Sequence, residues 1–400
     1  MAGIKTAIKR VIISPLREFI LDSRATGITL LFCTFLSLVV SNVSTSTSVA
    51  YVSFWNTSIY FPILLHLPHT LLHWINDLLM AAFFFLVGME IKRELLKGEL
   101  SSFRKAILPI AAAIGGMLAP ACIYALFNKD TQYISGWGIP MATDIAFSLG
   151  VVSLLGRRVP ISLKIFLIAL AIIDDLGAIL VIALFYGETV NWLYLALSGL
   201  LMTGGLLLTY YKKMKGWLLM LTGLLLWYFI FNSGIHATIA GVLLASLVPL
   251  NKLEQYEHRF HDPVNFIILP LFVLANTALV IPGNFGEAIN TSLSWGIILG
   301  LVVGKPLGIV LFSWVVVKLK WGQRPAGSNW TQMLGIGLLA GIGFTMSIFI
   351  TMLAFNDIIY QDISKIATMI ASFMAVLLSI FVLYLASSKR SGTYSTKRQR

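Results

Sequence analysis

Residues 161–186 read ISLKIFLIALAIIDDLGAILVIALFY, an apolar run that carries two adjacent carboxylates, Asp174 and Asp175, near its middle. On the insertion scale an Asp near the bilayer centre costs roughly 2.5 to 3.5 kcal/mol, whereas each Leu, Ile, Val or Phe returns only about 0.3 to 0.6 kcal/mol. Ionisable groups inside a membrane usually face a water-filled cavity or a partner, and they mark ion pathways and proton relays. The pair therefore predicts an ion or proton site, and a purely structural hydrogen-bonded pair is the alternative.

The composition places this run in a polytopic membrane protein. Of the 400 residues, 58% are hydrophobic and only 12% are charged, which is too apolar for a soluble globular protein. Apolar segments of roughly 17 to 25 residues recur along the chain, so we expect an all-α protein with about twelve transmembrane helices rather than a barrel. Cys33 and Cys122 lie in apolar runs without a C-x-x-C motif, which favours packing, and no cofactor is expected.

The basic residues indicate the topology. If the N-terminus is cytoplasmic, all but three of the 29 Lys and Arg residues fall in loops or termini on that side; the exceptions are Lys129, Lys365 and, inside a span, Lys305. The positive-inside rule therefore predicts that both termini are cytoplasmic. The net charge of +12 follows the membrane and does not require nucleic acid.

Three segments flank or interrupt the spans. Residues 1–25 carry apolar residues at helical spacing between basic ones, which predicts a cytoplasmic amphipathic segment on anionic lipid. Residues 43–70 are rich in Ser, Thr and aromatic residues without Lys or Arg; alternation around Tyr51 and Trp55 permits a short extracytoplasmic hairpin, and an ordinary loop fits equally well. Residues 387–400 form a basic cytoplasmic tail.

Two expected spans are interrupted at their middle. In span four, 133–155, Pro140 removes a backbone donor and is followed at once by Thr143 and Asp144, which predicts a break that opens a polar site. Span eleven, 332–355, contains glycines at odd spacing that suit tight packing or a second break: Gly335, Gly337, Gly341 and Gly343.

These interruptions occupy corresponding places. Spans three to five and ten to twelve each have an interrupted middle helix, and they run in opposite directions because one group starts inside and the other outside. Paired interrupted segments at corresponding places of inverted repeats point to a transporter binding site. Span ten, 295–317, adds Lys305 between Gly304 and Pro306, too deep to reach the interface by snorkelling.

Other titratable residues lie near the span ends. The inner loop before span nine carries Glu257, His258 and His261, a set that titrates between about pH 5 and 8 because unperturbed His does so, although a solvated loop is the simpler interpretation. The remaining candidates are placed at single span ends, where a structural role is the alternative: Asp77, Glu90 and His236.

Several blocks together resemble a known family over nearly the whole chain. They are WIND at 74–77, EIKRE at 90–94, PMATDIAF at 140–147, IDDLG at 173–177, SGIHAT at 233–238 and GKPLG at 304–308. In this order they resemble the bacterial NhaA sodium/proton antiporters. The resemblance implies one transmembrane transporter domain, 1–400, in the inner membrane, which expels Na⁺ or Li⁺ and admits more than one H⁺ per ion, so that transport is electrogenic.

The resemblance also implies roles for single residues. Asp174 and Asp175 match the cation and proton site, with Lys305 proposed to pair with Asp174. Thr143 and Asp144 match polar groups at the helix crossing, where Asp144 offsets positive helix ends and Lys305 offsets negative ones. The residues that match positions of the pH response are Glu90, His236, Glu257, His258 and His261. The loop 43–70 resembles a dimerisation hairpin, so a homodimer is expected. Asp262 departs from the pattern beside His261.

The residues themselves suggest competition between H⁺ and Na⁺ for the same carboxylates. Burial raises an Asp pKa by up to about 3 to 5 units, which brings it near neutral pH. Adjacent helical residues point in different directions, so Asp175 can bind the ion while Asp174 faces Lys305. Na⁺, as a hard cation, suits oxygen ligands, which Asp174, Asp175 and Thr143 can provide.

Two rival classes remain. A cation channel, or a carrier of another solute, uses the same membrane setting, but the repeated carbonyl filter or charged ring of a channel is not evident in the sequence. An intramembrane enzyme with an aspartyl dyad needs carboxylates from facing elements, and neither an H-E-x-x-H nor a G-x-S-x-G motif occurs.

Overall fold

The computed structural model describes residues 25–60, 66–187, 189–281, 283, 286 and 289–391. The predicted amphipathic segment at 1–25 and most of the basic tail at 387–400 lie outside these residues, so nothing is said of their structure. Within the described residues the secondary structure is helical, apart from an isolated antiparallel bridge between Ser58 and Thr70. The prediction of an all-α protein is therefore confirmed.

The first half of the chain contains α3 (Ala25–Asn42), α4 (Thr45–Trp55), α5 (Leu71–Trp74), the π-helical turn η3 (Ile75–Leu79), α6 (Met80–Leu96), η4 (Glu99–Ser101), α7 (Phe103–Asn128), the 3-10 helix η5 (Ile134–Met141), α8 (Ile145–Leu155), η6 (Gly156–Arg158) and α9 (Ile161–Phe185). The second half contains α10 (Trp192–Tyr210), α11 (Gly216–Phe231), α12 (Ile239–Leu247), α13 (Leu253–Pro263), the π-helical turns η7 (Val264–Ile268) and η8 (Gly300–Gly304), α14 (Leu269–Asn276), α16 (Ser292–Leu299), α17 (Lys305–Lys318), α18 (Trp330–Ala340), α19 (Phe344–Ala354) and α20 (Ile358–Ser391).

Many of these helices suit a membrane. Within the described residues, eight helices are long and apolar enough to cross a membrane. The number of spans in these residues is nine if α18 and α19, which meet at a 47° bend, count as one span. The chain is thus a multi-pass membrane protein, while the count of twelve spans stays a prediction. The apolar segment 234–250 forms a shorter helix than its hydropathy favours: Gly234 has a φ of +83°, and α12 covers only Ile239–Leu247.

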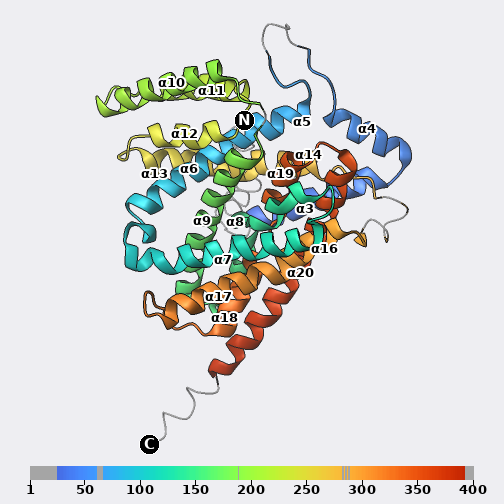
Figure 1. Cartoon of the computed structure of the whole chain (residues 1–400), viewed down its shortest axis with the longest axis vertical. Helices are drawn as coiled ribbons and strands as arrows, with labels where there is room; N and C mark the ends of the chain where they lie inside the picture. The colour runs from blue at the N-terminus through green and yellow to red at the C-terminus, as the bar shows by residue number, and fades with distance from the viewer. Residues whose placement is uncertain are drawn as a thin grey trace, which may run out of the picture.

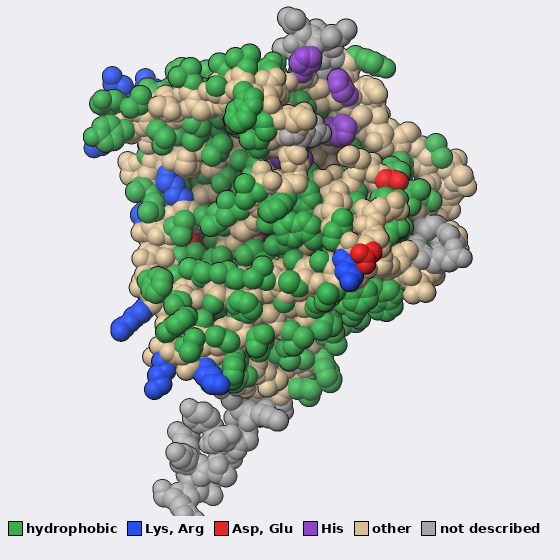
Figure 2. Space-filling model, viewed as in Figure 1, with side chains coloured by type: hydrophobic (Ala, Val, Ile, Leu, Met, Phe, Trp, Pro, Cys, Tyr) green, Lys and Arg blue, Asp and Glu red, His purple; other side chains and the backbone are tan. Residues whose placement is uncertain are grey.

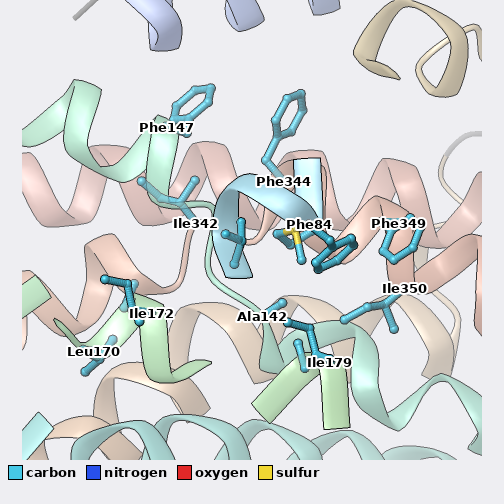
Figure 3. Close-up of a cluster of buried hydrophobic side chains, with 14 of the residues drawn as sticks. Phe84, Ala142, Phe147, Leu170, Ile172, Ile179, Ile342, Phe344, Phe349 and Ile350 are labelled. Carbon is cyan, nitrogen blue, oxygen red and sulfur yellow. The ribbon is translucent and has the colours of Figure 1, made fainter. Parts of the chain in front are cut away.

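The helix that carries the paired carboxylates lies among several others. α9 packs against α6, α7, α8 and α18, while α7 lies beside α17 and α18 beside α20 (Figure 1). Apolar side chains fill the space around the two breaks, with Ala142 and Ile342 from the breaks themselves and Phe84, Phe349 and Ile179 beside them (Figure 3). On the outer surface, most Lys and Arg side chains visible in Figure 2 gather along one edge, where helices end.

The loop at 43–70 differs from the hairpin that its alternation permitted. Tyr51 and Trp55 lie in α4, which begins at a capping box formed by Ser44 and Thr47. A capping box satisfies two backbone donors at once and so favours a helix over extended strands here. The bridge between Ser58 and Thr70 is the remnant of strand pairing in the described part of this loop.

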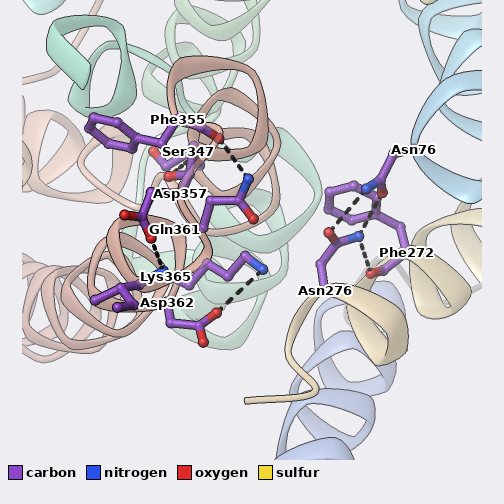
Figure 4. A network of polar contacts seen from close by, with 11 residues as sticks. Asn76, Phe272, Asn276, Ser347, Phe355, Asp357, Gln361, Asp362 and Lys365 are labelled. Carbon is purple, nitrogen blue, oxygen red and sulfur yellow. Dashed lines mark hydrogen bonds and ion pairs between the residues drawn. The ribbon is translucent and has the colours of Figure 1, made fainter. Parts of the chain in front are cut away.

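Buried polar pairs tie neighbouring helices together. Asn76 in η3 and Asn276 at the end of α14 exchange side-chain hydrogen bonds of 3.3 and 2.8 Å (Figure 4). At the start of α20 the buried ammonium of Lys365 lies 3.9 Å from Asp362. Such pairs keep polar groups satisfied inside an apolar bundle.

Candidate functional site

Two interrupted helices meet at the centre of the site. The first is η5 followed by α8, with Ala142 and Thr143 in extended backbone between them. The second is α18 followed by α19, separated by Gly341, Ile342 and Gly343. Each break leaves backbone N–H and C=O groups without helical partners, and groups of the other break satisfy several of them.

Asp144 caps the second half of both interrupted helices. Its Oδ1 accepts a hydrogen bond from the backbone N–H of Phe147 in α8 at 2.9 Å. Its Oδ2 accepts from the backbone N–H of Thr345 in α19 at 3.1 Å, and also from the Thr345 hydroxyl. Because helix N-termini carry partial positive charge, one buried carboxylate stabilises two helix starts.

The free carbonyls at the end of α18 are satisfied from the first break. The hydroxyl of Thr143 lies 2.9 Å from the carbonyl oxygen of Ala340, and the hydroxyl of Ser148 donates to Leu339 at 2.9 Å. The backbone N–H of Asp144 donates to the carbonyl oxygen of Ile342 at 2.7 Å. Polar groups of η5 and α8 therefore hold the C-terminal end of α18.

Asp174 faces a buried cation. Its Oδ2 lies 3.1 Å from the Nζ of Lys305 and 2.7 Å from the hydroxyl of Thr143, and both side chains of the ion pair are fully buried. The Lys305 ammonium also donates to the carbonyl of Met141, the last residue of η5. The positive charge thus lies at the C-terminal end of that short helix, where a cation is favoured.

Asp175 points elsewhere, as adjacent helical residues do. It is 1% exposed and lines a cavity of about 260 Å³ that also reaches Asp144, Thr143 and Thr345. The same cavity extends to Glu90 and His261. Neither Oδ1 of Asp175 nor Oδ1 of Asp174 has a hydrogen-bond partner among the described residues. Two buried carboxylate oxygens are therefore available to a cation or a proton.

A charged cluster lies near His261, outside the lining of this cavity. Arg93 forms an ion pair with Glu257 and a weaker one with Glu94, at 3.3 Å. Burial raises the pKa of Glu257 above its usual value near 4.5, and the positive charge of Arg93 opposes that rise. The second carboxylate oxygen of Glu257 is buried without a partner in the part of the chain that the structure describes.

The other predicted residues lie apart from the cavity lining. His258 is exposed on α13. His236 contacts the carbonyl of Tyr186 at 2.6 Å, beyond the last turn of α9. Asp77 lies in the π-helical turn η3. Of the residues expected to respond to pH, the structure brings Glu90 and His261 to the cavity, with Glu257 near them.

One site residue escaped the sequence analysis. Thr345 donates two hydrogen bonds to Asp144 and lines the cavity beside Asp175. A signal existed, since Thr345 follows Gly343 at the second break much as Thr143 follows Pro140 at the first.

Glycine permits close helix packing near Lys305. A Cβ at Gly337 of α18 would lie 2.9 Å from the Cα of Pro306, closer than real side chains approach. Gly337 therefore allows α18 to lie directly against the start of α17, and this contact positions Lys305.

Comparison with known proteins shows what the chain as a whole is similar to. The sequence profile described as Na⁺/H⁺ antiporter 1 matches residues 17–383. The chain is 49% identical to the Na⁺/H⁺ antiporter NhaA 2 of Flavobacterium johnsoniae, over 90% of this chain and 89% of that protein. It is 46% identical to the Na⁺/H⁺ antiporter NhaA of Cytophaga hutchinsonii, over 91% and 93% of the two chains. It is 48% identical to the Na⁺/H⁺ antiporter NhaA of Dechloromonas aromatica, over 90% and 92%.

Proposed function

Because this chain belongs to the NhaA family of Na⁺/H⁺ antiporters and exchanges Na⁺ for H⁺ across a membrane, we propose that Asp174 and Asp175 are the groups for which the two ions compete. Li⁺ is a second substrate of the same site. The observation that carries this proposal is the pair of buried, unpartnered carboxylate oxygens, one on each Asp.

The charges of the site support competition. The site contains three buried carboxyl side chains, Asp144, Asp174 and Asp175, and one buried amine, Lys305, so it would carry a net negative charge if all four groups were ionised. A buried excess of negative charge is strongly unfavourable unless a cation or a proton neutralises it. Asp144 is held by helix N-termini, so Asp174 and Asp175 are the carboxylates that alternate between Na⁺ and H⁺.

Asp175 binds the cation first in this proposal. It lines the cavity, whereas Asp174 is engaged with Lys305 and Thr143. When Na⁺ binds, Asp175 contributes a carboxylate oxygen, and Thr143 and Asp174 provide further oxygens of the kind that hard cations prefer. In the proton-loaded state of this proposal both carboxyl groups are protonated, and Na⁺ binding releases both protons, so more than one H⁺ moves per Na⁺ and the exchange is electrogenic.

The cytoplasmic end of the cavity regulates access. Glu90, Glu257 and His261 lie where an ion enters, and His258 and His236 act through their own helices. Protonation there changes the local charge, so transport falls in acid both by competition and by this cluster. Asp77, on the same helix as Glu90, adds a carboxylate to the route on the opposite side.

We also propose the membrane location, topology and oligomeric state that are expected for this family. We place the protein in the bacterial inner membrane with both termini cytoplasmic, in agreement with the basic edge in Figure 2. The fold is proposed to have twelve spans with inverted repeats, whose broken helices cross at mid-membrane. The 43–70 loop joins two protomers of a homodimer, and residues 1–25 lie on anionic lipid.

The test is collapse of a preformed proton gradient in proteoliposomes, followed with a pH-sensitive dye between about pH 6 and 9, a range that brackets His and buried-Asp titration. NaCl and LiCl should discharge the gradient of the wild-type protein, and KCl should not. Asp175→Asn should be silent, while Asp130→Asn, which alters a carboxylate that is 86% exposed just after α7, should behave as wild type. A gradient that survives both Na⁺ and Li⁺ would contradict the proposal, and Na⁺ flux without proton movement would favour a channel.

A further inference from the structure

A groove with an apolar floor and a basic rim opens at one end of three long helices. It has a volume of about 630 Å³ and lies between the start of α7, the start of α9 and the loop that joins α17 to α18. Leu108 and Phe166 form part of the floor and are buried, while Trp321 on the wall is 61% exposed. The groove is separate from the cavity that contains Asp175.

The rim of the groove carries more positive than negative charge. Its charged lining residues are Glu99, Arg104, Lys105 and Lys320. Lys105 pairs with Glu99 at 3.4 Å, but neither Arg104 nor Lys320 has an acidic partner among the described residues. Lys320 has a φ of +60°, a backbone conformation that non-glycine residues seldom adopt, so the loop presents its side chain from a fixed and unusual position.

The groove lies at the depth of lipid headgroups. α7 and α9 begin beside it and α17 ends beside it, and each belongs to a candidate membrane span. Trp is favoured at that depth, where one part of its ring meets acyl chains and another meets water. Basic pockets between membrane helices bind anionic lipid headgroups.

We propose that this groove binds one anionic glycerophospholipid. Its phosphate lies between Arg104 and Lys320, and the upper part of an acyl chain covers Leu108, Phe166 and Trp321. The chain's own termini are unsuitable occupants, because residues 1–24 carry an excess of Lys and Arg and residues 392–400 have no acidic residue. The charge of the rim therefore selects an anionic partner from outside the chain.

The experiment uses the full-length protein, delipidated in detergent, and titrates dioleoyl phosphatidylglycerol or dioleoyl phosphatidylcholine in mixed micelles. Native mass spectrometry measures retained lipid, and thermal denaturation measures stabilisation. Arg104→Gln with Lys320→Gln should weaken phosphatidylglycerol retention roughly thirty-fold, since each cation near an anionic lipid contributes about fivefold. The control, Lys212→Gln with Lys252→Gln, removes two cations elsewhere, one of them a lysine whose φ is +57°.

The outcomes separate the possible ligands. Preference for phosphatidylglycerol over phosphatidylcholine, lost in the Arg104 and Lys320 double variant and kept in the control, supports the proposal. The proposal is overturned if both double variants lose phosphatidylglycerol equally or if both retain it equally. It is also overturned if inorganic phosphate alone stabilises the protein. If the double variant denatures early without lipid, Trp321→Gln takes its place, and it should weaken retention of phosphatidylglycerol without changing the rim charge.

Discussion

Lys305 and Asp174 form an ion pair at 3.1 Å with both side chains fully buried, while Asp175, the next residue, turns away into the cavity. The two carboxylates of the doublet therefore have different surroundings. Asp174 has a compensating cation and a hydroxyl, and Asp175 has an accessible space. In the proposed mechanism, Asp174 therefore positions the site and Asp175 meets the ion first.

Replacing Lys305 by Met should lower the free energy of unfolding by about 3 to 5 kcal/mol, because it leaves a buried carboxylate without its partner. Asp174→Asn combined with Lys305→Met should recover much of that loss, since it removes both charges together. Thermal denaturation of the purified proteins in the same detergent measures both effects. Equal melting temperatures for wild type and the single Lys305 variant would show that the pair contributes nothing.

Thr345→Val should destabilise the protein by about 1.5 to 3 kcal/mol, because Asp144 loses a hydroxyl donor to a charged oxygen. Thr345→Ser keeps the hydroxyl and should lie close to wild type. The same two variants, assayed for proton-gradient collapse, should rank in the same order. A Val variant as stable as wild type would show that the hydroxyl of Thr345 contributes nothing to holding Asp144.

Gly337→Ala should destabilise by about 1 to 3 kcal/mol through overpacking, because its Cβ meets the backbone of Pro306. Gly204→Ala in α10 is the matched control, since a Cβ there has no heavy atom within 4 Å. That variant should be unchanged or more stable by up to about 1 kcal/mol, as Ala favours a helix over Gly. Thermal denaturation decides, and similar losses in both variants would rule out the steric explanation.

The pH dependence of stability should report Glu257. Burial raises the pKa of this carboxyl in the folded protein, so between its usual value near 4.5 and the raised value the folded state holds more protons than the unfolded state. The stabilisation from Glu257 is therefore complete below about pH 4.5 and is lost as pH rises through the folded pKa. Glu257→Gln should flatten the fall in melting temperature over that window.

The control for this prediction is Glu254→Gln, one turn earlier on the same helix, where the side chain is 74% exposed and pairs with Lys97 at 3.6 Å. It should leave the slope of melting temperature against pH unchanged. A slope that stays the same in the Glu257 variant would show that another group titrates in that window.

The sequence alone indicated the titratable residues of the site better than it indicated which residues contact them. Burying an Asp pair in an apolar run is costly wherever the run lies in the fold, so Asp174 and Asp175 could be identified from the local sequence alone. Thr345 was missed, because its position after the glycines of the second break is a weak signal until its hydrogen bonds to Asp144 are known. The helix at 45–55 was also missed, since period-two alternation of aromatic residues outweighed the local capping signal at Ser44.

The end of α12 illustrates the same limit. Hydropathy alone favours a full span at 234–250, but the backbone turn at Gly234 delays the start of the helix. At its other end, Lys92 of α6 donates hydrogen bonds of 2.7 Å to the carbonyl oxygens of Ser246 and Val248. Such contacts join residues far apart in the chain, and no local pattern encodes them.

The capping of α8 and α19 by the single carboxylate of Asp144 has a mechanical consequence. If either helix start were displaced alone, a buried carboxylate would lose some of its hydrogen-bond donors. The inner ends of the two helices therefore shift as one rigid body. Any hinge that opens the site alternately to the two sides of the membrane must lie outside this body, at the surfaces where it slides against neighbouring helices.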